Sequence, residues 1–383
     1  MFRIRDEFLR AQLAISALFC FLGFQYATWA SRLPALKADL DLSEAQLGLL
    51  LMACGAGAAA SFPLVGILMK RLGSRRLTFL SALCLGLLLL ALAAAPNYPV
   101  ALAVICLDGV AVGCLNVSMN AQGAALEVKY GRTAMSRLHA TFSAGSLGAA
   151  LLASGVNLFT PSLAAHFGVA AVLLLLLVAL ARNGLLTQDP EPEDKQRPKS
   201  GMPSRMTLWM GGAMVFGTVT EGAMNDWSAL YMEDVVDAAA EIAPLGIAVT
   251  SVMMVLARLF ADGWRTRWGD ARIVRLGSAL AGAGLALALL AGGVVTALIG
   301  FACVGLGIAA VTPCVYVAAA RQGPQSLALV AAMGTTGLLA GPALIGFIAS
   351  GSSLVWGMAA VAASALLVSV CATQIRWPAL ADA

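Results

Sequence analysis

Charged residues are scarce in this chain. Only 11% of its 383 residues are Asp, Glu, Lys or Arg, whereas 60% belong to the hydrophobic set. Soluble domains carry about 25% charged residues, so this composition argues against an ordinary soluble protein and indicates an integral membrane protein. The formal net charge of +4 is small, and the bases lie between apolar runs instead of along one stripe, which argues against nucleic-acid binding.

The residues and motifs that hold metals and nucleotides are also rare. The chain has two histidines, and none of its eight cysteines forms a C-x-x-C pair. We therefore predict no metal site, and we interpret the cysteines, which all fall in apolar segments, as small buried hydrophobic residues. The phosphate-binding pattern G-x-x-x-x-G-K-[S/T] does not occur, so we expect no cofactor and no ATP bound by this chain.

Long apolar runs are what the sequence has in abundance. About 20 residues in a helix span the hydrocarbon of a bilayer, and each run approaches or exceeds that length. We count twelve runs, near 8–30, 44–69, 77–95, 98–128, 134–159, 163–186, 206–232, 243–264, 273–292, 294–320, 325–349 and 353–375. They predict an all-α integral membrane protein with twelve transmembrane helices.

One polar stretch divides the runs into six and six. It reads T-Q-D-P-E-P-E-D-K-Q-R-P-K-S-G-M-P-S-R and has almost nothing to bury. We predict an N-terminal six-helix bundle at 1–186, a cytoplasmic linker at 187–205 and a C-terminal six-helix bundle at 206–383. Because basic residues gather in alternate loops, the positive-inside rule predicts that both termini also lie in the cytoplasm. The loop bases are Lys70, Arg71, Arg75, Arg76, Lys129, Arg132, Arg137, Arg265, Arg267, Arg272, Arg275 and Arg321.

The run 206–232 carries an acid at membrane depth. Glu221 lies near its middle, and Asn225, Asp226 and Trp227 follow. A carboxylate facing lipid is costly, so such an acid faces a water-filled cavity or a partner. We therefore interpret Glu221 as the first candidate for a proton carrier. Asp226 is a second candidate, or it pairs with Arg32 as an outer gate.

Other polar side chains share helical faces in the runs 8–30, 98–128 and 206–232. Amides in such positions either bond one helix to another or contact a solute, and the two tryptophans either stack on a sugar or ring or lie at the membrane interface. The substrate-binding candidates are Gln25, Tyr26, Trp29, Asn116, Asn120, Asn225, Trp227 and Tyr316.

The two halves of the chain repeat each other. W-A-S-R-L at Trp29 and W-S-A-L-Y at Trp227 lie 198 residues apart, and Gly73 and Gly269, which follow the second and eighth runs, lie 196 apart. Two matches at nearly one offset, together with the six-plus-six count, indicate the parallel repeats of a transporter fold.

Over essentially its full length the chain resembles the major facilitator superfamily. The family's signature after its second helix is G-x-x-x-D-R-x-G-R-R, and Gly66, Arg71, Gly73, Arg75 and Arg76 match it, with Lys70 in place of the acid. The second copy keeps an acid at Asp262. The glycines permit a tight turn, and the charges pair across the cytoplasmic helix ends when the cavity closes there. The resemblance therefore implies gating by Arg71, Gly73, Arg258, Asp262 and Gly269. Arg32 is a further gating candidate because of the charge pair that it would form with Asp226.

Within that superfamily the chain is most similar to the fucose permeases. L-N-V-S-M-N-A from Leu115 to Ala121 and E-G-A-M-N-D-W from Glu221 to Trp227 carry this match. Fucose permeases place a proton-coupling acid where Asn116 falls. In its place, Asp108 or Glu221 supplies the proton site in our interpretation.

The resemblance and the buried acids together predict a secondary active transporter. We expect a monomer in the bacterial plasma membrane that moves a small polar solute, such as a sugar or related metabolite, by alternating access in symport with protons. An exporter of amphipathic compounds or drugs driven by protons is the alternative. A sensor without transport activity and an intramembrane enzyme form a third class.

Overall fold

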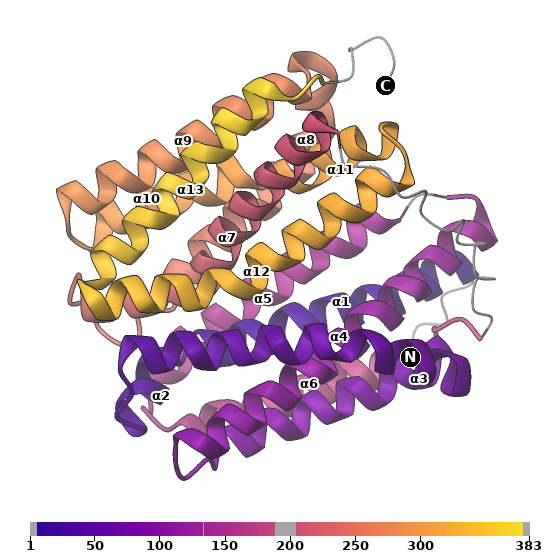
Figure 1. Ribbon diagram of the computed structural model, residues 1–383. Coiled ribbons are helices and arrows are strands. Elements are labelled where there is room, and N and C mark those ends of the chain that lie inside the picture. The colour runs from indigo at the N-terminus through magenta and orange to yellow at the C-terminus, as the bar shows by residue number, and fades with distance from the viewer. Residues whose placement is uncertain (1–5, 133, 188–203, 378–383) are drawn as a thin grey trace. The chain divides into compact units, whose positions relative to one another are not determined.

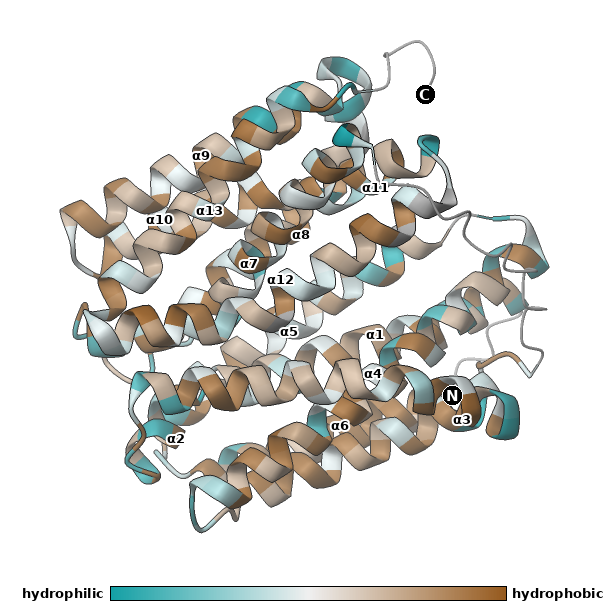
Figure 2. Cartoon of the chain, in the orientation of Figure 1, coloured by the Kyte–Doolittle hydropathy of each residue, from teal (hydrophilic) through white to brown (hydrophobic). Residues whose placement is uncertain are grey.

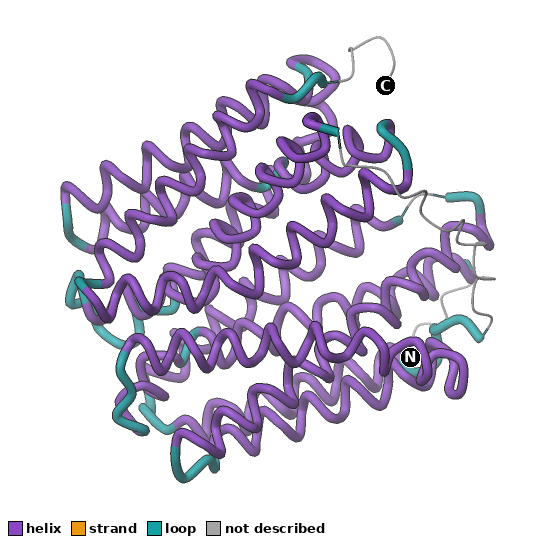
Figure 3. Tube along the Cα trace, in the orientation of Figure 1, coloured by secondary structure: helices purple, strands orange, loops and turns teal. Residues whose placement is uncertain are grey.

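The computed structural model describes residues 6–132, 134–187 and 204–377. Within these ranges the chain forms helices and no strand, which confirms the predicted all-α class (Figure 1, Figure 3). The helices are α1 (Glu7–Ala30), α2 (Leu33–Asp39), α3 (Glu44–Ala93), α4 (Tyr98–Tyr130), α5 (Met135–Asn157), α6 (Leu163–Ala181), α7 (Arg205–Asp234), α8 (Leu245–Trp268), α9 (Asp270–Ala291), α10 (Val294–Ile308), α11 (Val311–Arg321), α12 (Pro324–Gly351) and α13 (Leu354–Gln374).

These helices supply twelve long segments at the places of the twelve predicted runs. α3 contains two of them, 44–72 and 74–93, because Gly73 is not helical. α10 and α11 together form one continuous stretch, Val294–Arg321. The 7-residue helix α2, which follows α1 after a two-residue turn, is the one described helix that the sequence did not predict.

Apolar residues run along most of the helices, and hydrophilic residues gather at their ends and connections (Figure 2). Eight described helices, with α3 counted once, are long and apolar enough to cross a membrane. α5 and α7 are not among them, although they have 23 and 30 residues, because polar side chains lower their hydropathy. Polar side chains within a transmembrane helix either join it to another helix or face a pathway for ions or substrates.

The chain forms two compact units, which we call unit 1 and unit 2. Unit 1 comprises Met1–Asp41 and Ala53–Lys195, and unit 2 comprises Leu42–Met52 and Gln196–Ala383. In unit 1, α1 packs against α4, α5 and α6; in unit 2, α7 packs against α8, α10, α11, α12 and α13. α1 and α7 are thus the central helices of their units, and both carry candidate residues.

The position of α1 is fixed by close backbone contact with α5. A Cβ atom built on Gly23 would lie 2.0 Å from the carbonyl oxygen of Phe142, and one on Gly145 would lie 2.1 Å from that of Cys20. No larger residue fits at either position, which is how small residues bring membrane helices together. This contact holds Gln25, two residues after Gly23, in a defined place.

Gly73 and Gly269, at the repeated positions of the two units, have the same backbone conformation. Gly73 has φ 71° and ψ 163°, and Gly269, between α8 and α9, has φ 76° and ψ 151°. A positive φ is strained for residues with a Cβ, so glycine suits both turns. The repeated sequence offset therefore corresponds to a repeated structure.

Candidate functional site

The most enclosed polar contact in unit 1 joins α1 to α4. Gln25 Nε2 donates a hydrogen bond of 2.8 Å to Oδ1 of Asp108, and the two residues are 0% and 2% exposed. Gln25 Oε1 and Asp108 Oδ2 have no hydrogen-bond partner among the described residues. Asp108 is therefore a buried carboxyl whose partner in the described part of the chain is a neutral amide and no cation.

The asparagines of α4 bond within their own helix. Asn120 Nδ2 donates to the backbone oxygen of Asn116 at 2.8 Å and to Asn116 Oδ1 at 2.6 Å. Asn116 is exposed and Asn120 half-buried. Both of these hydrogen bonds lie within α4, and solute contact stays a prediction. Glu127, which the sequence places on the same face, accepts backbone hydrogen bonds from Ala134 and Met135 at the start of α5.

The two aromatic candidates on α1 contact each other. The rings of Tyr26 and Trp29 pack edge to face, with centroids 5.0 Å apart. Trp29 is buried, as is Trp227 in unit 2, and neither indole Nε1 has a hydrogen-bond partner among the described residues. Both tryptophans thus lie in the interior of their units, and stacking on a solute stays a prediction.

In unit 2 the central acid forms an ion pair. Arg258 Nη2 on α8 lies 3.1 Å from Oε1 of Glu221, with side-chain exposures of 22% for the arginine and 27% for the glutamate. Asn225, one turn after Glu221, donates to the Glu221 backbone oxygen at 3.2 Å. Glu221 is therefore neither directed into solid packing nor left without a counter-charge.

Asp226 and Trp227 lie on another face of α7 than Glu221 and are buried, whereas Glu221 and Asn225 are half-buried. Ser228, which the sequence spacing places on the face of Glu221 and Asn225, is also buried. Tyr316 on α11 is also half-buried. The predicted pair of Asp226 with Arg32 would join the two units and stays a prediction.

The predicted gating residues have different surroundings. Arg32 is buried, and its Nη2 donates to the carbonyl oxygen of Pro161, whereas Arg71 is exposed beside Gly73. The side chain of Asp262 lies outside the described residues. Arg258 forms an ion pair with Glu221, and its gating role together with Asp262 stays a prediction.

Three polar groups were missed by sequence reasoning. In unit 2, Asp270 directly follows Gly269 and pairs with Arg265, Nε to Oδ1 at 2.8 Å and Nη2 to Oδ2 at 3.2 Å. In unit 1, the buried side chain of Gln122 bonds Ser74 and Leu186. His166 is buried, and neither ring nitrogen has a hydrogen-bond partner among the described residues. Only Asp270 had a signal in the sequence, an acid at a helix start five residues after an arginine.

Comparisons with known proteins agree with this architecture. The sequence profile of the Major Facilitator Superfamily matches residues 13–328. An uncharacterized MFS-type transporter of Yersinia pestis is 34% identical over 376 residues, covering 95% of this chain and 95% of that protein. An uncharacterized transporter of Sinorhizobium fredii is 31% identical, covering 94% and 97%, and the membrane protein MosC of Rhizobium meliloti is 31% identical, covering 89% and 84%.

Solved structures show the same fold at lower identity. The nucleoside transporter NupG aligns with a TM-score of 0.71 at 16% identity, covering 96% of this chain and 98% of that one. A D-xylose-proton symporter aligns with a TM-score of 0.71 at 14% identity, covering 97% and 99%. FucP, in an outward conformation, aligns with a TM-score of 0.65 at 16% identity, covering 97% and 100%.

Proposed function

The chain belongs to the Major Facilitator Superfamily of multi-pass membrane transporters, and on that premise we propose that it carries a small polar solute together with protons. The solute class is a sugar or a related metabolite, and the mechanism is symport by alternating access. The transporter is not an enzyme. We place it as a monomer in the bacterial inner membrane, with both termini in the cytoplasm, because its loop bases follow the positive-inside rule.

The observation that carries this proposal is the pair formed by Gln25 and Asp108. An ionised carboxylate buried without a cation is costly, and a bound proton removes that cost. Taking up and releasing a proton at Asp108 would therefore change the energy of the structure around α1 and α4. That change is what a proton-coupled carrier needs to link its conformation to a proton gradient.

Partly exposed polar groups within each unit support a polar solute. Asn116 and Asn120 in unit 1, and Asn225 and Glu221 in unit 2, are partly exposed within long apolar helices. Amide and carboxylate groups match the hydroxyl groups of a sugar or ribose, whereas an amphipathic compound needs a largely apolar lining. The printed names of two structural neighbours, a nucleoside transporter and a D-xylose-proton symporter, are consistent with this class.

Flux measurements with the purified full-length protein test the proposal. We would first screen nucleosides, D-xylose and other monosaccharides for a rise in melting temperature, because a ligand at 100 times its Kd stabilises the folded state by about 2.7 kcal/mol. Each compound that binds would then be followed in sealed proteoliposomes under an imposed pH gradient. Accumulation of a polar solute on the alkaline side supports symport.

Two other outcomes would contradict it. Movement of lipophilic cations against the proton flow, with no uptake of polar solutes, would support the exporter. Binding without flux of any compound would support a sensor.

A further inference from the structure

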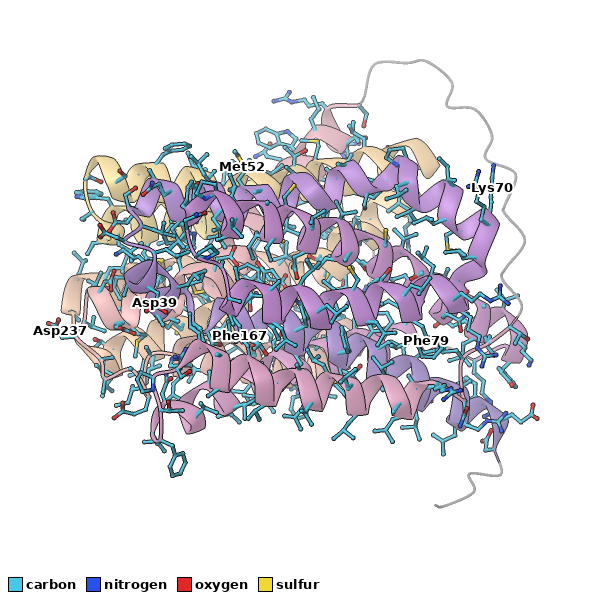
Figure 4. The ribbon with its side chains drawn as sticks, turned by 90° about the horizontal axis from the view of Figure 1, so that it is seen from below. Asp39, Met52, Lys70, Phe79, Phe167 and Asp237 are labelled. Atoms are coloured by element: carbon cyan, nitrogen blue, oxygen red, sulfur yellow. The ribbon has the colours of Figure 1, made fainter. Side chains whose placement is uncertain are left out.

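A cavity of about 860 Å³ lies within unit 1, beside the turn at Gly73. The second segment of α3 and the end of α6 form its walls. Its lining includes Arg75, Arg76 and Arg182, together with the apolar side chains of Leu72, Phe79, Leu83, Leu175, Val178 and Ala179. In Figure 4, Lys70 and Phe79 lie toward one end of the unit 1 helices and Asp39 toward the opposite end. The cavity is therefore at the basic end of this unit.

The charged side chains that line the cavity are all positive. Three arginines line it, and no acid does so among the described residues. Arg75 Nη2 donates to the backbone oxygen of Arg182 at 3.1 Å, which holds the two residues together. Three guanidinium groups around one cavity repel each other unless an anion lies among them, and guanidinium groups bind phosphate oxygens in a bidentate way.

The rest of the cavity is apolar and leads to the outer surface of the helices. Leu83 and Leu175 line it and are both exposed, and Leu80, Leu87 and Leu176 on the same helices are exposed as well. In a membrane protein, exposed leucines along a transmembrane helix face lipid tails. A soluble anion has no use for such a wall, whereas an acyl chain would bury apolar surface against it.

The site is held in shape by the buried side chain of Gln122. Its Nε2 donates to Ser74 Oγ at 2.6 Å and to the backbone oxygen of Leu186 at 2.9 Å, and its Oε1 accepts from Leu186 N at 2.8 Å. Ser74 lines the cavity, and Leu186 precedes Thr187, which also lines it. The segments at Ser74 and Leu186, on either side of the arginines, are thus both hydrogen-bonded to α4. The cavity is therefore formed before any ligand binds.

We propose that this cavity binds a phospholipid with a negatively charged head group. The phosphate lies among Arg75, Arg76 and Arg182, and an acyl chain lies along Phe79, Leu83 and Leu175. Basic pockets between helix ends on the cytoplasmic side of a membrane have the chemistry that anionic lipids require. Because Gly73 and Ser74 belong to the same wall, the lipid would contact the turn that joins the two segments of α3.

Native mass spectrometry of the purified full-length transporter tests this proposal with phosphatidylglycerol, cardiolipin and phosphatidylcholine as probes. We expect the wild type to prefer the two anionic lipids. A triple variant, Arg75→Gln, Arg76→Gln and Arg182→Gln, should bind the two anionic lipids at least about tenfold more weakly, with phosphatidylcholine binding unchanged. A control variant, Arg267→Gln, Arg272→Gln and Arg321→Gln, removes the same charge from helix ends of unit 2 and should bind like the wild type.

Further variants and probes distinguish a bound lipid from a bound free anion and from a general loss of charge. Replacing the three arginines by lysine keeps the charge and the fold, so binding should largely return. Phe79→Ala should weaken long-chain phosphatidylglycerol and leave a short-chain form unaffected. Equal losses in the triple variant and its control, or no preference for anionic lipids in the wild type, would overturn the proposal. So would displacement of phosphatidylglycerol by millimolar inorganic phosphate, which would indicate a site for free phosphate.

Discussion

Asp108 in unit 1 and Glu221 in unit 2 are both acids within long apolar helices, and they have different partners. Asp108 in unit 1 is fully buried and receives a hydrogen bond from the neutral amide of Gln25, whereas Glu221 in unit 2 is partly exposed and pairs with Arg258. A carboxylate beside a guanidinium group is stabilised in its charged form, and one beside an amide in an apolar interior is not. We therefore propose that the two acids have different tasks, proton binding at Asp108 and charge pairing at Glu221.

This contrast changes the order of the candidates. The sequence alone favours Glu221, because a carboxyl in the middle of a long apolar run is costly without a partner. The structure supplies that partner as Arg258 and leaves Asp108 as the acid without a counter-charge among the described residues. We therefore propose Asp108 as the principal proton site and Glu221 as part of a charge pair in the solute pathway.

The largest expected effect follows from Asp108→Asn. Asparagine keeps the hydrogen bond with Gln25 and cannot exchange a proton. A gradient of one pH unit supplies about 1.4 kcal/mol per proton, or about a tenfold accumulation of solute, and the variant should lose all of it while still exchanging labelled for unlabelled solute. Uptake and counterflow in proteoliposomes measure the two quantities. Accumulation that survives in Asp108→Asn would move the proton site elsewhere.

A smaller effect is expected from Glu221→Gln, which leaves Arg258 without this acid. For a partly buried pair we expect a loss of about 1–2 kcal/mol in stability, and the double variant Glu221→Gln with Arg258→Gln should recover part of it. Thermal unfolding of the two single variants and the double variant gives the coupling energy. If Glu221→Gln instead abolishes gradient-driven accumulation and spares exchange, the assignment of the two acids is reversed.

The turns at Gly73 and Gly269 show the same contrast between the two units. Unit 2 secures its turn with the ion pair of Arg265 and Asp270, and unit 1 secures its own with the neutral, buried hydrogen bonds of Gln122. Unit 1 has Lys70 where the family motif has an acid. Among the described residues, the contacts that hold its turn are hydrogen bonds and include no ion pair.

The stability that the Gln122 hydrogen bonds and the Arg265–Asp270 ion pair contribute should depend differently on salt concentration. Gln122→Ala leaves buried groups unpaired and should cost about 1–3 kcal/mol at any salt concentration. Asp270→Asn removes a partly exposed pair and should cost about 1 kcal/mol or less, a loss that shrinks in high salt. Melting temperatures at low and high salt measure both. A salt-dependent loss in Gln122→Ala would contradict the distinction.

Much of the fold could be predicted from sequence because lipid removes most alternatives. A run of apolar residues at membrane depth must be helical, so the twelve segments and the glycine turns followed from composition and spacing. Side-chain partners did not follow. Arg258 has Asp262 one turn away in sequence, yet its described partner, Glu221, comes from another helix. Gln122 and His166 gave no signal, since a single polar residue in an apolar run looks the same whether it joins helices or contacts solute.

The smallest effect, and the one in which the two units should behave alike, concerns the glycines themselves. Gly73→Ala and Gly269→Ala each place a Cβ on a backbone with positive φ, which costs about 1–2 kcal/mol regardless of the neighbouring charges. Melting temperatures should fall by similar amounts in the two variants, at low and at high salt. Equal losses of stability would show that the two turns share one backbone conformation, which each unit stabilises with different side-chain contacts. If only one variant is destabilised, the repeat is limited to the sequence. The difference between the Gln122 hydrogen bonds and the Arg265–Asp270 ion pair then reflects two unrelated turns.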